Sequence, residues 1–121
     1  MGPLDVRSED AGGAILVSVK GEIDSGTIEV LHPVLDDGIG RALEAAARVV
    51  VIDLGDVTYF GSAGLNAVLG CFERGVEAGV AVRVVATNTE VTRPLEITKL
   101  DRVLRPYRSV AAALSDDRAP E

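Results

Sequence analysis

The stretch VVVIDLGDVTYFGSAGL, residues 49–65, decides how this chain folds. Its first six residues form a short, β-branched apolar run, which is typical of a strand buried on both faces. Four of its last five residues are small, and a helical pattern begins with these five. We therefore predict a central strand over Val49–Leu54, a short connection, and a helix that carries the hydroxyl of Ser62 at its N-terminus.

The residues before this stretch predict a hairpin and a helix. Alternation of apolar and polar residues over 4–9 and again over Ala14–Lys20, with a glycine pair between them, is typical of two antiparallel strands. Helical spacing of apolar residues follows from Thr27 to Ala47. Proline in a helix interior costs about 3 kcal/mol or more, so we expect a kink or a late start at Pro33 and weak order near Gly38.

The residues after the stretch predict two further α/β steps. The helix of Ser62 should run to Ala78, followed by a strand over Val80–Ala86. A third helix should follow, with possible caps over residues 87–90, although Pro94 leaves its start open because proline is best placed in a first turn. A short strand at Val103–Leu104 and a final helix capped by Ser109 complete the series. The alternating elements predict one α/β domain over residues 1–121, with a mixed four- to five-stranded β-sheet packed with about four α-helices, and a frayed tail over 115–121.

The helix of Ser62 has two distinguishable sides. At about 100° per residue, its larger apolar residues form one stripe that should face the core, namely Leu65, Val68, Leu69, Phe72 and Val76. The opposite side is small and smooth apart from one arginine, and comprises Ala63, Ala67, Gly70, Cys71, Arg74 and Ala78. Such a side could admit a partner helix closely, or a second layer of the same domain could cover it.

Composition limits the possible functions. The chain is 47% hydrophobic, and its 12 basic and 19 acidic residues give a net charge of −7. This charge disfavours nucleic acid and anionic membrane as partners and favours another protein, particularly a basic one. The lone Cys71 can form neither an internal disulfide nor a metal site, which fits a reducing cytoplasm. No apolar run is long enough to span a membrane, and we expect no cofactor.

The central stretch contains residues that suggest three kinds of chemistry. Ser62 as a nucleophile would need a glycine two residues earlier, where Phe60 stands, and His32 is the only possible histidine base. Asp53 ends the right kind of strand for a phosphoryl acceptor, but the region that would have to supply the acidic pair for magnesium, Val17–Lys20, contains no such pair. The segment 61–64 lacks the lysine of a phosphate-binding loop. A small enzyme or nucleotide-binding domain of flavodoxin-like shape is therefore a minor alternative.

Four segments, in order and at compatible spacings, resemble one family. They are GEID at 21–24, VVIDL at 50–54, FGSAGL at 60–65 and RPLEITKLDRVL at 93–104. Together they resemble the STAS family and, within it, the bacterial anti-sigma factor antagonists. Two positions depart from the family pattern: Gly61 replaces the usual aspartate before the serine, and Lys99 replaces a glycine after the third helix.

The resemblance implies a regulator without catalytic residues. Such a protein binds an anti-sigma factor, often itself a serine kinase, and releases the sigma factor. The kinase then phosphorylates the serine matching Ser62, the complex dissociates, and a phosphatase resets it. The expected partner-binding residues are Glu22, Asp24, Gly61, Ser62, Ala63, Gly64, Ala67, Gly70 and Arg74. Because of Gly61, constitutive binding without phosphorylation is the alternative; the sequence leaves the oligomeric state open.

Overall fold

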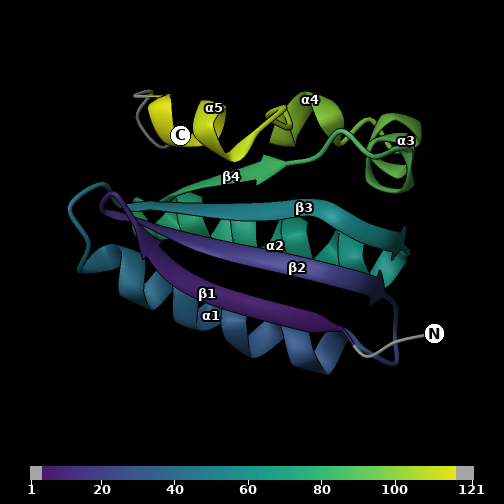
Figure 1. Ribbon diagram of the computed structural model, residues 1–121, viewed down its shortest axis with the longest axis horizontal. Coiled ribbons are helices and arrows are strands. Elements are labelled where there is room, and N and C mark those ends of the chain that lie inside the picture. Colours follow the sequence, from purple (N-terminus) through teal and green to yellow (C-terminus); the bar gives the residue numbers. More distant parts are fainter. Residues whose placement is uncertain (1–3, 117–121) are drawn as a thin grey trace.

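The computed structural model describes residues 4–116, which form one mixed sheet with helices on both faces (Figure 1). The strands are β1 (Asp5–Ala11), β2 (Ala14–Ile23), β3 (Val49–Phe60) and β4 (Ala81–Val85), in the spatial order β1-β2-β3-β4. The helices of the described chain are α1 (Ile28–Leu43), α2 (Ser62–Ala78), α3 (Thr89–Ile97), α4 (Asp101–Leu104) and α5 (Val110–Ser115). The predicted α/β class with a mixed sheet is confirmed.

The first two strands form the expected hairpin. β1 pairs antiparallel with β2 around a turn in which Gly12 and Gly13 have φ values of 60° and 90°, where glycine is favoured. β2, β3 and β4 pair in parallel, because the helices α1 and α2 carry the chain back between them. All carboxyl ends of these three strands therefore lie at one edge of the sheet.

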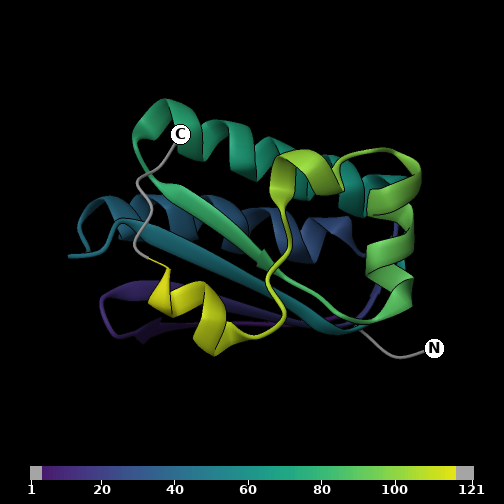
Figure 2. The same cartoon turned by 90° about the horizontal axis from the view of Figure 1, so that it is seen from above.

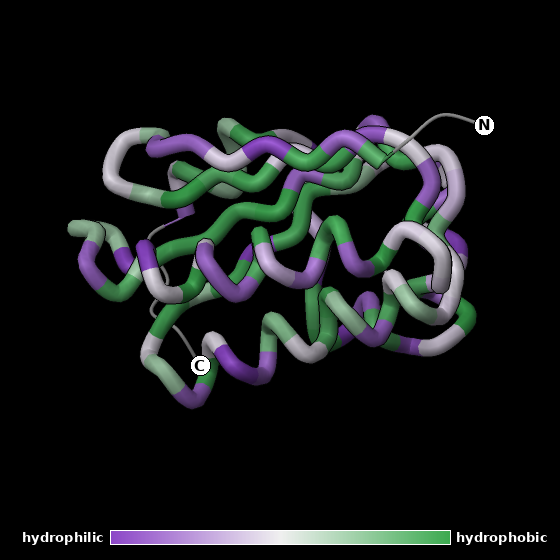
Figure 3. Tube along the Cα trace, turned by 90° about the horizontal axis from the view of Figure 1, so that it is seen from below, coloured by the Kyte–Doolittle hydropathy of each residue, from purple (hydrophilic) through white to green (hydrophobic). Residues whose placement is uncertain are grey.

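The core has two parts, one on each face of the sheet. On one face α1 and α2 cover the larger cluster, which includes the predicted inward residues Ile15, Val17 and Val19 of β2. On the other face α5 covers a smaller cluster around Val49 and Val51. Figure 2 shows α5 and α2 on opposite sides of the sheet. In Figure 3 the central strands carry long hydrophobic stretches, whereas β1 at the edge is mixed.

Helix α1 does not start late at Pro33, as one of the two predictions for this residue had it. It begins at Ile28, and Pro33 lies inside it on the exposed side, where water can satisfy the carbonyl that lost its amide partner. Gly38 is buried rather than poorly ordered: a Cβ there would lie 3.7 Å from side-chain atoms of Val17 and Val50. Gly38 therefore lies directly against the sheet, at a distance at which a methyl group would make ordinary van der Waals contact.

The last part of the chain also differs from its prediction. Residues 101–104 form helix α4 and not a strand, since Leu104 N donates to Leu100 O at 2.8 Å and the Leu104 side chain is buried. An isolated bridge between Val85 and Tyr107 is what remains of a fifth strand. The cap at Ser109 is confirmed, with Oγ accepting from Ala112 N at 3.0 Å. Most of the tail predicted to fray lies outside the described residues, and Ser115 belongs to α5.

Lys99 ends α3 in a left-handed conformation, with φ of 66°. A non-glycine residue pays about 1–2 kcal/mol for this conformation, whereas glycine loses more entropy on folding. We expect Lys99→Gly to raise the free energy of unfolding by about 0.5–1 kcal/mol, measured by urea denaturation. Arg93→Gly, at an exposed position in the middle of the same helix, is the matched control and should lower the free energy of unfolding by a similar amount. Equal effects of the two substitutions would contradict a strained Lys99.

Candidate functional site

The ends of β2 and β3 place the predicted site residues together. Ile23 pairs with Phe60 at the end of the ladder, and Gly61 N donates to Ile23 O at 3.2 Å. Ladder pairing with β2 therefore extends β3 six residues beyond the predicted end at Leu54, to Phe60, through a segment whose glycine and aspartate concealed the strand. The end of β2, with Glu22, and the turn that follows it, with Asp24, consequently lie beside the start of α2.

The first turn of α2 is pressed against the end of the sheet. Ile23 and Phe60 are buried there. A Cβ on Gly64 would lie 2.8 Å from the Phe60 ring and 3.0 Å from Ile23 Cγ2, so only glycine fits without displacement. Gly64 is thus a packing residue, and the prediction that it faces a partner is wrong.

Ser62 is the first residue of α2, and its side chain is exposed. The N-cap is Gly61, with φ −86° and ψ −174°, and it supplies no side-chain cap. Ser62 therefore lies within the first turn of the helix and is not its N-cap. The first intrahelical bond joins Leu65 N to Gly61 O at 3.1 Å, so the N–H groups of residues 62–64 precede the helical ladder. Residues 62–65 are uncharged, and this end of the helix carries the positive end of its dipole.

The GEID segment shapes the turn beside Ser62. Gly21 has φ of 116°, which favours glycine, at a register shift between β2 and β3. The Asp24 carboxylate accepts from Gly26 N at 2.8 Å and from Thr27 N at 3.0 Å, and Thr27 Oγ1 donates to Glu22 O at 2.8 Å. Asp24 therefore fixes the turn, while the Glu22 side chain is half-buried at the same edge.

Tyr59 is a residue of this edge that the sequence reasoning missed. Its side chain is 53% exposed. A Cβ at Gly61 would lie 3.0 Å from Tyr59 Cε2 and 3.1 Å from its hydroxyl oxygen, so the ring occupies the place of a side chain at 61. The signal was present in the sequence, because residues two apart on a strand share a face and residue 61 is a glycine.

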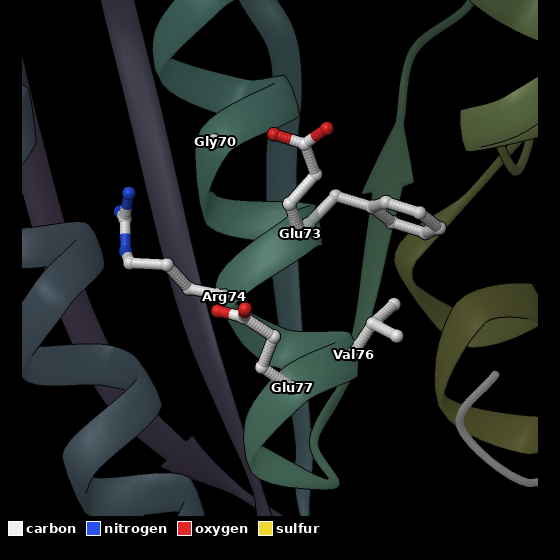
Figure 4. Close-up of a pocket in the computed structure, with 6 residues that line it drawn as sticks. Gly70, Glu73, Arg74, Val76 and Glu77 are labelled. Atoms are coloured by element: carbon white, nitrogen blue, oxygen red, sulfur yellow. The ribbon is translucent and has the colours of Figure 1, made fainter.

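The smooth side predicted for α2 is mostly covered by the domain itself. Ala67 is 2% exposed and Cys71 fully buried, so the prediction that Ala67 faces a partner is wrong. Gly70 is half-buried. Arg74 extends towards α1, on the other side of the helix from Val76 (Figure 4), and pairs with Asp36 at 2.8 Å. Burial also raises the pKa of the Cys71 thiol to about 11, against a smaller lowering by Arg74, so the thiol is protonated at neutral pH.

The predicted core stripe of α2 is displaced for the same reason. Val68 is buried and Leu65 and Phe72 pack partly against the core, but Val76 is 42% exposed. Small residues take the innermost places, because the helix lies close to the sheet. They are Gly64, Ala67, Cys71 and Gly75.

The structure brings together no further groups that would support the other chemical alternatives in the described part of the chain. Asp53 accepts from Gly55 N at 3.0 Å, the turn role expected of an aspartate where the strand bends. Within residues 4–116 no group of histidine, cysteine and acidic side chains could hold a metal ion. No helix in the described chain is long and apolar enough to cross a membrane.

Comparisons with known proteins agree on one family. The sequence profile of the STAS domain matches residues 5–113. The chain is 30% identical to the anti-sigma-F factor antagonist RsfB of Mycobacterium tuberculosis over 115 residues, which cover 95% of this chain and 90% of RsfB.

Solved structures share the fold. The crystal structure of an anti-sigma factor antagonist from Mycobacterium paratuberculosis matches with a TM-score of 0.83 and 29% identity, over 93% of this chain and 92% of that one. The phosphorylated form of the Bacillus cell fate determinant SpoIIAA matches with a TM-score of 0.68 over 94% of this chain and 100% of that one. Its identity is 13%, so this likeness concerns the fold alone.

Proposed function

Because this chain belongs to the STAS domain family, we propose that it is an anti-sigma factor antagonist that docks with the edge around Ser62. It binds an anti-sigma factor and thereby releases the sigma factor. The similarity to RsfB, named an anti-sigma-F factor antagonist, supports this role. The observation that carries it is an exposed serine at the first position of a helix without a side-chain cap, beside Glu22 and Asp24.

We further propose that phosphorylation of Ser62 switches the binding off. A phosphate adds about −1.5 to −2 charges. The N–H groups of residues 62–64 and the helix dipole can receive this charge, so the free domain tolerates it. A partner docked on Ser62 would instead bury an unpaired dianion, which costs several kcal/mol. The asymmetry between the free and bound states is what makes the modification a switch.

Gly61 is compatible with this switch. An aspartate at the N-cap would place a carboxylate at the same helix end and compete with the phosphate for the N–H groups. Glycine leaves them to the phosphate. The anti-sigma factor would be the kinase, and a phosphatase would return the protein to its binding state.

Conversely, the missing carboxylate in front of Ser62 and the ring of Tyr59 in its place favour the alternative, constitutive binding without phosphorylation.

The test uses the purified chain and each anti-sigma factor encoded in the same genome, with binding measured by calorimetry. We expect one of them to bind the wild type, Ser62→Ala to bind it within a few-fold, and Ser62→Asp to bind about 100-fold more weakly, since 1.4 kcal/mol is tenfold. Circular dichroism should show both variants folded. Equal binding of the two variants would contradict the switch, and binding of none of the anti-sigma factors would contradict the antagonist.

Mass spectrometry after incubation with the bound anti-sigma factor and ATP separates the switch from the alternative. One phosphate on the wild type and none on Ser62→Ala supports phosphorylation of Ser62. An unmodified wild type that still binds supports the constitutive alternative.

A further inference from the structure

The ring of Tyr59 takes the position beside Ser62 that a side chain at residue 61 would fill. Gly61 is extended, so a side chain there would project from the same side of the chain as that of Tyr59. The space is already filled, since the Tyr59 ring atoms lie 3.0 to 3.3 Å from the place of that Cβ. Glycine at 61 is therefore what allows the aromatic ring to lie against the start of α2.

The Tyr59 ring contributes little to the packing of the fold. Tyr59 is 53% exposed, and its hydroxyl has no hydrogen-bond partner among residues 4–116. Its neighbour Phe60, 4% exposed, fills the core at this end of the strand. Truncation of Tyr59 would thus leave no cavity, in contrast to truncation of Phe60. Exposed tyrosines of this kind are frequent anchors of protein interfaces.

A carboxylate stands next to the ring. Glu22 is the ladder partner of Tyr59, so both side chains project from the same face of the sheet, while their neighbours Ile23 and Phe60 project into the core. The Glu22 carboxylate forms no ion pair within the part of the chain that the structure describes. An aromatic face beside a carboxylate suits a guanidinium, which stacks on the ring and donates to the acid.

We propose that Tyr59 and Glu22 form a contact for an arginine of the anti-sigma factor, and that Gly61 holds the ring in place for it. The proposal rests on the proposed function, because its occupant is the same partner. The net charge of −7 agrees with a basic partner surface. Tyr59 accordingly contributes to partner specificity, and this contribution does not depend on Ser62 or its phosphate.

The test measures affinity for the anti-sigma factor that binds the wild type. We expect Tyr59→Ala to lose about tenfold in affinity, Tyr59→Phe to lose less than about threefold, and Tyr59→Leu to resemble Ala, because leucine offers no π face. Glu22→Gln should weaken binding and reduce its dependence on salt. The double variant should lose less than the two single losses combined, since both remove contacts to one cation.

Two controls separate this contact from general effects. Leu114→Ala truncates another exposed apolar side chain, on α5, which covers Val49 at the far end of β3, and should bind like the wild type. Gly61→Ala should leave the melting temperature within a few degrees, because the flexible ring can move away, but lower the affinity about as much as Tyr59→Ala.

The outcomes that would overturn the contact differ from those that test the antagonist. Wild-type affinity in Tyr59→Ala, or in Tyr59→Leu, would exclude the arginine contact while leaving the response to Ser62→Asp intact. Strict additivity of the Tyr59 and Glu22 losses would exclude a shared cation. Failure of the wild type to bind any anti-sigma factor would reject the proposed function itself.

Discussion

Ala67→Glu is expected to unfold the domain. Ala67 lies in the core cluster between α2 and the sheet and is 2% exposed, so a glutamate there would carry its carboxylate into a site without a partner. Burial of an unpaired charge costs several kcal/mol, against a total stability of about 5–15 kcal/mol for a typical domain. We expect the far-ultraviolet circular dichroism to lose its cooperative thermal transition.

The matched control is Asn66→Glu, one residue earlier on the same helix. Asn66 is exposed, so its glutamate remains in water and the melting temperature should stay within a few degrees of the wild type. A cooperative transition of Ala67→Glu at the wild-type temperature would show that α2 presents a different face from the one described. The pair thus tests the rotation of α2 about its axis.

Gly75→Ala is expected to cost about 2–3 kcal/mol. A Cβ at Gly75 would lie 2.6 Å from Val82 Cγ2 and 2.7 Å from the carbonyl oxygen of Val80. The carbonyl belongs to the backbone, at the point where Val80 N donates to Gly75 O at 2.8 Å, so relief requires that α2 move away from β4. Urea denaturation should give a lower midpoint with an unchanged slope.

Gly40→Ala provides the comparison in α1. Apart from the backbone of its own helix and its chain neighbours, no atom of the described residues lies within 4 Å of the Cβ that alanine would add. Alanine there should therefore raise stability by about 0.5–1 kcal/mol through its helix propensity. Opposite signs at the two glycines are expected. A neutral Gly75→Ala would mean that the contact between α2 and β4 is looser than the structure shows.

The close packing of α2 on the sheet also shows why part of the site could not be predicted from the sequence. The order of strands and helices followed from alternation and helical spacing, because those patterns are local. The face of α2 did not, because hydropathy gives most weight to large side chains such as Val76, which proved exposed. Where a helix lies close to a sheet, small residues occupy the contact, and only the packed structure shows how close the two elements come.

The edge around Ser62 was predicted more fully than the rest of the site. The GEID and FGSAGL segments are local signals, and the structure places both at one end of the sheet. Tyr59 was missed because its ring lies in the space that Gly61 leaves empty. Recognising this requires that residues 59 and 61 be considered together. Residues 55–60 did not look like a strand, since their strand conformation comes from pairing with β2 rather than from propensity.

Helix α5, which covers the smaller core cluster on the second face of the sheet, is the last element of the described chain to be synthesised. The strands that expose Val49, Val51 and Val85 are complete once residue 85 has been made, but α5 begins only at Val110. Arg83, 7% exposed, donates from Nη1 to the carbonyl of Ala113 at 2.7 Å, and this bond joins the late helix to the sheet. On the ribosome, where chains grow from the N-terminus, this apolar patch therefore remains uncovered until α5 emerges, and until then it is the kind of surface through which incomplete chains aggregate.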